Sequence, residues 1–306
     1  MSYNFIMNVL IISGGTSNER SVSLKSGVAV GDALRANGHN VSYHDPKFND
    51  LSKINKRNID VAFPVTHGSH GEDGRLQEEL EKLNFAYVGS DSKSSKICFN
   101  KLDLKKKLQK INILTPKCAL ANMQSIGNHE LFSSPFVLKP YAEGSSVDTF
   151  IEREPEMADW GKINDVLLNR YPEMLLEELI EGTEITVPIL GSDALPIVEI
   201  IPPEGQVFDY DNKYNGLSEE LCPPRSISME LQEKAKQLAL RVHKIAGCRH
   251  YSRTDMIIDK HNNIYVLETN TLPGMTDESL FPKSAKAAGI SMQELCERLI
   301  NLATTH

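Results

Sequence analysis

The chain has 306 residues, of which 40% are hydrophobic and 24% charged, and its formal net charge is -8. This length suits two or three domains, and the composition is that of an ordinary globular protein. The negative balance argues against general nucleic-acid binding, which needs a basic stripe, and no stretch approaches the roughly 20 apolar residues of a membrane span.

The cysteines and the N-terminus indicate a reducing compartment. The cysteines are odd in number and scattered, with no CxxC pair: Cys98, Cys118, Cys222, Cys248 and Cys296. Free thiols in a reducing cytoplasm are therefore expected. The first residues lack a basic segment and lead directly into an apolar run, so we expect no signal peptide and a cytoplasmic protein.

The first third of the chain alternates between short apolar runs and a helical pattern. Residues 8–13, 41–43 and 61–65 read as strands, and residues 21–37 as a helix that Gly38 terminates. This alternation predicts a doubly wound domain with a parallel sheet.

In such a domain, ligands gather beyond the carboxyl ends of the strands, where two loops are placed. The loop 14–21 contains Glu19, and the Gly-rich loop 67–74 begins with His67. The first loop is not a GxGxxG fingerprint, which disfavours a dinucleotide. Glu19 has two interpretations that the sequence leaves open, a ligand-binding carboxylate or a residue that favours the positive end of the following helix.

The middle of the chain places a lysine before a small, flexible loop. Residues 100–110 predict a basic amphipathic helix, and the apolar strand 136–140 contains Lys139. Because a buried lysine is rarely unpaired, Lys139 is expected to face an anion. The following loop 143–147 (EGSSV) can present backbone N–H groups to phosphate, although an ordinary hairpin is the alternative.

The next segments are strands, a long irregular connection and a helix. Residues 185–190 and 194–200 predict neighbouring strands, whereas 202–224 has no clear periodicity and indicates a lid or a disordered segment. Residues 229–246 predict an amphipathic helix, and 291–303 another that Ser291 caps, with Glu294 at the capping-box position.

Between those two helices lies the most informative stretch, a hairpin that carries acidic side chains. Side chains two apart on a strand share a face, so Arg253 and Asp255 point one way, as do Glu268 and Asn270. A tight turn centred on 261–262 pairs Asp255 with Glu268 and Arg253 with Asn270, although other turn lengths fit. These oxygen ligands suit magnesium or manganese, and a solvated face with a surface ion pair is the alternative.

Taken together, these motifs resemble the ATP-grasp superfamily and, within it, the D-alanine–D-alanine ligase family, over essentially all 306 residues. The matching motifs are 14–23 (GGTSNERSVS), His67-Gly68 with 71–74 (GEDG), Lys139-Pro140 with 143–147, Asp209-Tyr210 with Lys213-Tyr214, and 268–276 (ETNTLPGMT), the last being the most specific. Ser252 stands where the family more often has glycine, and the lid around 215–217 follows no family pattern that can be matched.

The resemblance implies a fold, a reaction and a set of roles. The fold is α/β and in part α+β, an ATP-grasp fold behind an N-terminal doubly wound domain. Its domains are 1–91, 92–181 and 182–306, with a lid at 202–224. The reaction joins two D-alanine molecules through an acyl phosphate and uses ATP and two Mg²⁺ (or Mn²⁺) ions. The resemblance also implies a homodimer with no nucleic-acid or membrane partner. Two alternatives remain open, a ligase joining D-alanine to D-lactate and a non-catalytic nucleotide-binding regulator.

The site residues follow from the same resemblance. Lys101, Lys139 and Lys213 would contact ATP phosphates, Glu177 and Leu179 the adenine, and Glu184 the ribose. Asp255, Glu268 and Asn270 would bind the metal ions. Glu19 would bind the ammonium of the first D-alanine beside His67, and Ser145 and Tyr214 would hold the lid near Glu19. Arg253 and the N–H of Gly274 would stabilise the oxyanion, and Ser279 with Leu280 would receive the carboxylate of the second D-alanine.

Overall fold

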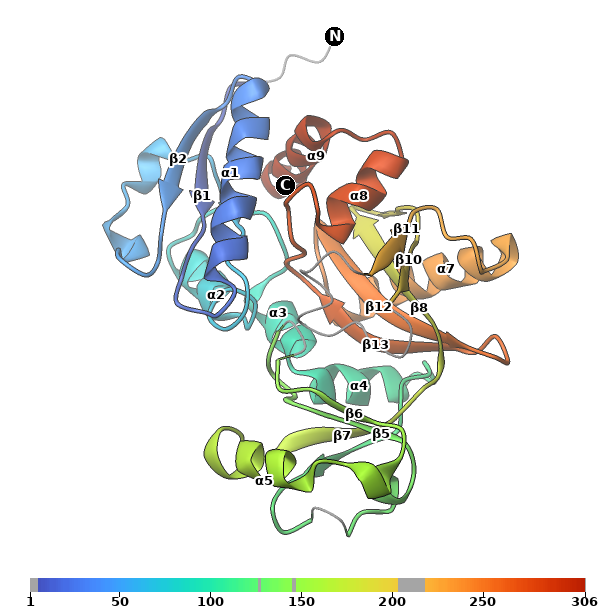
Figure 1. The fold of residues 1–306 in the computed structure, drawn as a ribbon. Helices are drawn as coiled ribbons and strands as arrows, with labels where there is room; N and C mark the ends of the chain where they lie inside the picture. Colours follow the sequence, from blue (N-terminus) through green and yellow to red (C-terminus); the bar gives the residue numbers. More distant parts are fainter. Residues whose placement is uncertain (1–4, 126–127, 145–146, 203–217, 306) are drawn as a thin grey trace.

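The computed structural model describes residues 5–125, 128–144, 147–202 and 218–305. It begins with a parallel three-stranded sheet in the order β2-β1-β3, which confirms the predicted alternation (Figure 1). Its strands are β1 (Asn8–Ile12), β2 (Asn40–His44) and β3 (Val61–Pro64), and α1 (Arg20–Ala36) and α2 (Arg75–Lys82) follow β1 and β3. Apart from Asn8, every residue of β1 is buried, as a continuous apolar run predicts.

The two ends of the chain meet in one hydrophobic core. Helix α1 packs Val30 and Leu34 against β1 and β3, and Gly38 ends it with a φ of +91°. Helices α8 (Leu280–Ala287) and α9 (Met292–Thr304) add Phe281, Leu295, Leu299 and Ile300 to the same core. Figure 1 shows α9 alongside α1, so the N-terminal sheet is covered in part by residues from the far end of the chain.

A second, antiparallel sheet has the order β4-β7-β5-β6 and its own core. Its elements are β4 (Cys118–Ala121), β5 (Phe136–Lys139), β6 (Phe150–Glu152), α5 (Trp160–Asn169) and β7 (Met174–Glu178). Phe132, Phe136 and Trp160 stack edge-on or tilted with ring centroids 5.1–6.0 Å apart. Because Phe136 lies on β5, this core fixes the strand that ends at Lys139.

The third sheet has six strands in the order β11-β10-β8-β12-β13, with β9 paired to β8. Its elements are β8 (Gly182–Leu190), β9 (Asp193–Ala194), β10 (Val198–Ile201), β11 (Glu219–Leu221), α7 (Met229–Ala246), β12 (Tyr251–Asp259) and β13 (Ile264–Asn270). Helix α7 has the predicted bounds, with Leu231, Ala235, Ala239 and Val242 buried.

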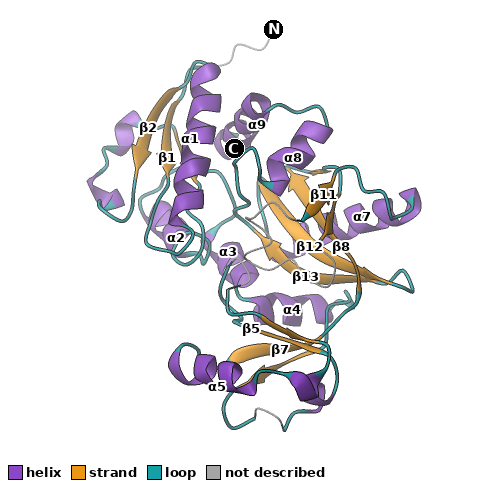
Figure 2. Ribbon diagram, in the orientation of Figure 1, coloured by secondary structure: helices purple, strands orange, loops and turns teal. Residues whose placement is uncertain are grey.

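Two helices of the middle of the chain also pack on this third sheet. They are α3 (Ser92–Phe99) and α4 (Lys101–Gln109), which contribute Cys98, Leu104 and Leu108 to its core. Figure 2 shows α4 between the two antiparallel sheets. One face of α4 therefore meets the third sheet while the rest of the helix faces the second.

The β12–β13 hairpin has the predicted side-chain pairs but not the predicted turn. Arg253 lies opposite Asn270, and Asp255 opposite Glu268, as expected. Nearer the turn, Met256 pairs with Val266, which shifts the register by one residue. A β-bulge absorbs this shift, and it restores the acidic pair that a shorter turn alone would have misaligned.

The segment 202–224 differs from its prediction at its described end. Residues 219–221 form β11, which pairs antiparallel with β10 and extends the sheet. The sequence signal was weak because β11 has only three residues, Glu-Glu-Leu, with no apolar alternation. The residues of this segment from 203 to 217 lie outside the described part of the chain.

Helix α9 shows half of the predicted capping box. The Ser291 hydroxyl accepts a hydrogen bond from the Glu294 N–H at 3.2 Å. The Glu294 carboxylate, which the box would turn back towards residue 291, pairs instead with Arg298 at 2.5 Å. The predicted start of the helix is confirmed, and the acidic residue stabilises its second turn.

Bulk features of the described residues agree with the composition. All five cysteines are free thiols. Among the described helices, none is long and apolar enough to cross a bilayer.

Candidate active site

Two cavities adjoin where the three sheets meet. One, of about 560 Å³, lies between the second and third sheets, and the other, of about 1140 Å³, opens between α1, the end of β13 and the start of α8. Lys101, Glu143, Gly144 and Glu268 line both cavities. A molecule in one cavity can therefore reach a molecule in the other at this shared wall.

The structure distributes the predicted site residues between these cavities. The smaller cavity is lined by Lys101, Lys139, Glu177, Leu179, Glu184, Asp255 and Glu268. The larger cavity is lined by Glu19, His67, Lys101, Arg253, Glu268, Asn270, Gly274, Ser279 and Leu280. Ser145, Lys213 and Tyr214 lie outside the described residues, so their predicted roles have no structural counterpart here.

The predicted metal ligands lie on the facing strands of the hairpin. Arg253 donates from Nε and a terminal nitrogen to the two oxygens of Asp255, both at 2.9 Å, and the Thr186 hydroxyl donates to Asp255 Oδ1 at 2.5 Å. Glu268 Oε2 lies 3.2 Å from Lys101 Nζ. Burial lowers the pKa of Arg253, but Asp255 outweighs it and the net shift is upward, so the guanidinium stays charged.

This donor set fits a hard divalent cation. Two carboxylates on paired strands and the Asn270 amide supply only oxygen ligands at the shared wall of the cavities. The Asn270 oxygen already accepts the Leu272 N–H at 2.7 Å, which holds the amide in one orientation. Arg253 and Lys101 form ion pairs with these two carboxylates, at 2.9 and 3.2 Å, beside the shared wall.

A buried cluster of charges lies behind the smaller cavity. Glu177 is 2% exposed, and its two oxygens lie 2.8 Å from Lys139 Nζ and 2.8 Å from Lys105 Nζ. Burial raises the pKa of Glu177, but the two lysines outweigh it and the net shift is downward, so the carboxylate is charged. Lys139 was predicted to face an anion, and the structure identifies Glu177 as one. The sequence analysis missed Lys105, because nothing in a helical pattern indicates a partner 72 positions away.

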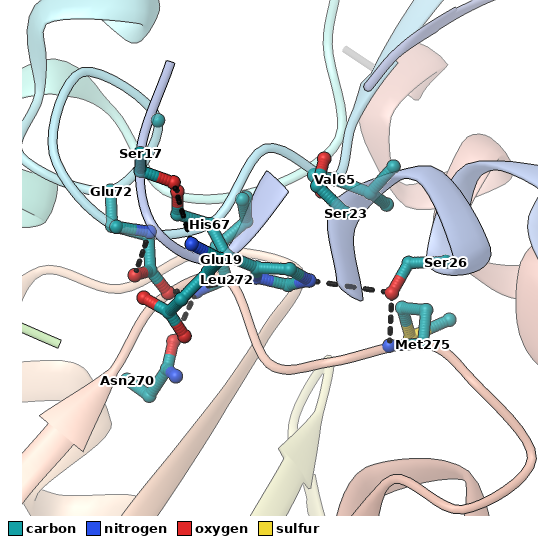
Figure 3. A network of polar contacts seen from close by, with 12 residues as sticks. Ser17, Glu19, Ser23, Ser26, Val65, His67, Glu72, Asn270, Leu272 and Met275 are labelled. Atoms are coloured by element: carbon teal, nitrogen blue, oxygen red, sulfur yellow. Dashed lines mark hydrogen bonds and ion pairs between the residues drawn. The ribbon is translucent and has the colours of Figure 1, made fainter. Parts of the chain in front are cut away.

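Glu19 and His67 belong to a polar network at the start of α1. Figure 3 shows Ser26 between the His67 ring and the Met275 backbone, at 3.3 Å from His67 Nε2 and from the Met275 nitrogen. The Ser17 hydroxyl donates to the His67 carbonyl at 2.6 Å. These bonds join loops 14–21 and 67–74 to the 271–276 loop, so residues far apart in sequence form one wall.

Glu19 sits at the N-cap position of α1, yet its side chain makes no capping bond to the helix. A Cβ atom placed on Gly68 would come 3.0 Å from Glu19 Oε2, and one placed on Gly144 would come 2.7 Å from it. The carboxylate therefore reaches across the cavity between two glycine loops that leave it room. This placement favours the ligand-binding interpretation over the helix-dipole one.

Gly274 and Ser279 border the start of α8. The Ser279 hydroxyl accepts the Thr276 N–H at 3.1 Å and contacts the Thr276 hydroxyl at 2.8 Å, which tightens the turn into the helix. A Cβ atom on Gly274 would lie only 2.7 Å from the Ser279 hydroxyl, so a larger residue here would displace that hydroxyl. Ser279 makes no side-chain capping bond at the start of α8, so this helix end suits a carboxylate in the larger cavity.

We expect Glu19→Gln to weaken binding of an ammonium group in the larger cavity by roughly ten- to a hundredfold, because a charge-assisted contact contributes about 1.5–3 kcal/mol. Nucleotide affinity should change little, since Glu19 does not line the smaller cavity. Initial rates across amino-acid concentration and a melting curve measure both effects. A lower melting temperature with an unchanged concentration dependence would support the helix-dipole interpretation instead.

Comparison with known proteins gives a consistent family. The family model "D-ala D-ala ligase C-terminus" matches residues 112–301, and "D-ala D-ala ligase N-terminus" matches residues 42–90. A D-alanine–D-alanine ligase of Carboxydothermus hydrogenoformans is 39% identical over 310 residues, covering 97% of this chain and 98% of the relative. One from Syntrophobacter fumaroxidans is 39% identical over 308 residues, covering 97% of each.

Comparison with solved structures indicates the same family. The D-alanine–D-alanine ligase of Bacillus anthracis complexed with ATP superimposes with a TM-score of 0.80 at 31% identity and covers 97% of both chains. A D-Ala:D-Ser ligase of Enterococcus faecalis gives a TM-score of 0.81 at 26% identity, covering 98% of this chain and 100% of the other. The fold is thus shared by enzymes that differ in their second substrate.

Proposed function

The chain belongs to the D-alanine–D-alanine ligase family of the ATP-grasp superfamily, and from that premise we propose how its cleft performs the reaction. The activity is the ATP-dependent joining of two D-alanine molecules to D-alanyl-D-alanine, with ADP and phosphate as products, for peptidoglycan precursor synthesis. The observation that carries this function is the match to such ligases over 97% of the chain.

ATP is proposed to occupy the smaller cavity, between the second and third sheets. Lys139 lines this cavity, and Lys101 lies at the wall shared with the larger cavity, where its Nζ donates to the Glu143 carbonyl at 2.7 Å. We assign Lys101 and Lys139 to the phosphates, Glu177 and Leu179 to the adenine, and Glu184 to the ribose. This order places the terminal phosphate towards the shared wall and therefore towards the larger cavity.

Two magnesium ions are proposed to bind at Asp255, Glu268 and Asn270. The support is the oxygen-only donor set on paired strands at the wall where the phosphates would lie. When bound, the ions supply positive charge that offsets the charge of the phosphate oxygens. Arg253 and Lys101, which pair with the two carboxylates in this structure, then become available to the substrates.

The residues of the larger cavity are proposed to bind both D-alanine molecules. Glu19 binds the ammonium of the first, beside His67, and the start of α8 with Ser279 and Leu280 receives the carboxylate of the second. This arrangement directs the carboxylate of the first substrate towards the shared wall and the terminal phosphate.

The chemistry then proceeds in two transfers. A carboxylate is a poor electrophile because its charge repels nucleophiles, so its oxygen first accepts the terminal phosphoryl group of ATP and ADP leaves. The amine of the second D-alanine attacks the carbonyl carbon of this acyl phosphate. Arg253 and the Gly274 N–H stabilise the charge that develops on the carbonyl oxygen, phosphate leaves, and the amine gives up a proton.

The test is phosphate release from ATP that depends on added D-alanine, with the dipeptide identified by mass spectrometry. A non-catalytic regulator releases no phosphate under these conditions. Parallel reactions with D-lactate and D-serine as second substrate separate the dipeptide ligase from its relatives, since the fold is common to a D-Ala:D-Ser ligase. If the enzyme prefers D-lactate or D-serine, that compound replaces D-alanine as the proposed second substrate, and the proposal for the nucleotide site is unchanged.

We also propose the division of the chain at residues 91 and 181 and a homodimeric assembly. The second and third sheets have separate hydrophobic cores, which supports the division at residue 181. Helices α3 and α4 belong to the segment 92–181 but pack on the third sheet, so they connect the two subdomains. Sedimentation equilibrium measures the assembly directly.

A further inference from the structure

Lys105 is a fully buried lysine outside every motif that the family match rests on, and burial lowers its pKa while Glu177 opposes that shift. It lies on α4, is 0% exposed, and is among the largest fully buried side chains of the described residues. Its Nζ donates to the Thr115 hydroxyl at 2.7 Å and lies 2.8 Å from Glu177 Oε1. An ionised group in such a place is costly unless it is paired, so the pairing with Glu177 is the feature to explain.

The cluster has one more positive charge than negative. Lys105 and Lys139 share the single carboxylate of Glu177, one lysine on each oxygen. Lys101 and Glu268 nearby form a pair of opposite charges and cancel. Of these two lysines only Lys139 lines the smaller cavity, where its side chain is 13% exposed and where Glu268 and Glu184 also attract it.

The placement of α4 explains how this arrangement is held. Leu104 and Leu108 pack into the core of the third sheet, while the neighbouring Lys105 reaches Glu177 on β7 of the second sheet. Figure 2 shows α4 between those two sheets. Glu177 and Lys139 lie on adjacent strands, so the three charged groups keep a fixed geometry behind the cavity.

We propose that Lys105 is a positioning residue for the nucleotide phosphates, acting through Glu177 and Lys139. It takes up one oxygen of Glu177, so that this carboxylate orients Lys139 without cancelling its charge. An anionic phosphate in the smaller cavity then meets the Lys139 ammonium in a fixed orientation. The inference rests on the proposed nucleotide site in the smaller cavity.

A merely structural role would have a different signature. If Lys105 only filled space on α4, its loss would lower stability and weaken all nucleotides alike. If it controls the charge of the cluster, the loss of affinity should grow with the number of phosphates on the ligand and be smallest for adenosine.

The test is Lys105→Met, which removes the charge and keeps a long side chain, compared with Lys106→Met on the exposed face of the same helix. Calorimetric titration with adenosine, AMP, ADP and ATP gives four affinities for each variant. We expect Lys105→Met to bind ATP roughly ten- to a hundredfold more weakly and to lose much less affinity for adenosine, whose base is assigned to Glu177, and we expect Lys106→Met to match the wild type. In steady state, KM for ATP rises, while kcat at saturating ATP and KM for D-alanine change little.

A second substitution checks the charge argument. The double variant Lys105→Met/Glu177→Gln loses one positive and one negative charge, so the net charge of the cluster equals that of the wild type. The affinity for ATP, relative to that for adenosine, should therefore be higher than in Lys105→Met alone. If Lys105→Met does not fold, Thr115→Val removes the hydroxyl that orients Lys105 and should weaken ATP in the same direction, by less.

Three outcomes separate the inference from the proposed function. If Lys105→Met binds adenosine and ATP more weakly by the same factor, the inference is overturned and Lys105 has a structural role. Unchanged binding in Lys105→Met, with ATP binding lost in Lys139→Met, also overturns it but keeps the nucleotide site. Unchanged ATP binding in Lys139→Met removes the proposed nucleotide site itself.

Discussion

We expect Glu268→Gln to abolish dipeptide formation while the protein keeps its fold. The carboxylate lies at the wall shared by both cavities, opposite Asp255 on the neighbouring strand, and we assign it to the metal ions. Removing the charge of this carboxylate weakens metal binding and therefore the stabilisation of the phosphate oxygens, which carry most of the negative charge of the transferring group. Asp255→Asn should have the same effect. Coupled measurement of ADP release, with circular dichroism for the fold, gives both results.

Glu230→Gln is the matched control for this substitution. Glu230 is an exposed carboxylate at the start of α7, where it pairs with Lys234, and it lines neither of the two cavities. Its replacement should leave turnover unchanged. Titration of Mn²⁺ in the presence of ADP adds a readout that does not depend on activity, and weaker binding is expected only for the hairpin variants. Near-normal turnover of Glu268→Gln at saturating magnesium would refute the metal assignment.

We expect Arg253→Lys to lower kcat by roughly two to three orders of magnitude, the loss typical of removing one donor from an oxyanion site. The lysine retains the positive charge, so Asp255 keeps a cationic neighbour. It loses the planar fork that now places two nitrogens 2.9 Å from the two Asp255 oxygens. Because the effect belongs to the transition state, KM for D-alanine and the affinity for ATP should change much less.

Rapid mixing of enzyme, ATP and D-alanine distinguishes this role from a structural one. If Arg253 acts at the second transfer, a burst of ADP formation should persist in Arg253→Lys while dipeptide formation is slow. Loss of the burst together with loss of ATP binding would instead mean that Arg253 mainly supports Asp255 and the nucleotide site.

The hairpin shows how far sequence reasoning reached at the site. Arg253 and Asp255, like Glu268 and Asn270, are two apart, and strand geometry alone puts each pair on one face. The pairing between the strands needed the turn as well, and several turn lengths fit the polar residues between them. The prediction of the pairs was confirmed although the turn was misplaced, because the bulge next to Met256 compensates.

Long-range pairing explains most of what the sequence did not disclose. Lys105 belongs to a helix with lysines at four of its nine positions, and nothing local distinguishes it from its exposed neighbour Lys106. Only the packing of α4 between two sheets selects which lysine is buried. The strand β11 was missed for a related reason, since its three residues gain their structure from pairing with β10.

The shared core of the first sheet has a consequence for the order of synthesis. Val9, Ile11 and Phe63 belong to the first strands made, and their packing partners include Phe281, Leu299 and Ile300, which are made near the end. Asn37 and His39 complete this junction by contacting Glu297 at 3.0 and 2.8 Å. A nascent chain must keep part of its first sheet exposed, or covered by a chaperone, until α9 has left the ribosome. The first sheet and the C-terminal helices should then unfold in one cooperative step.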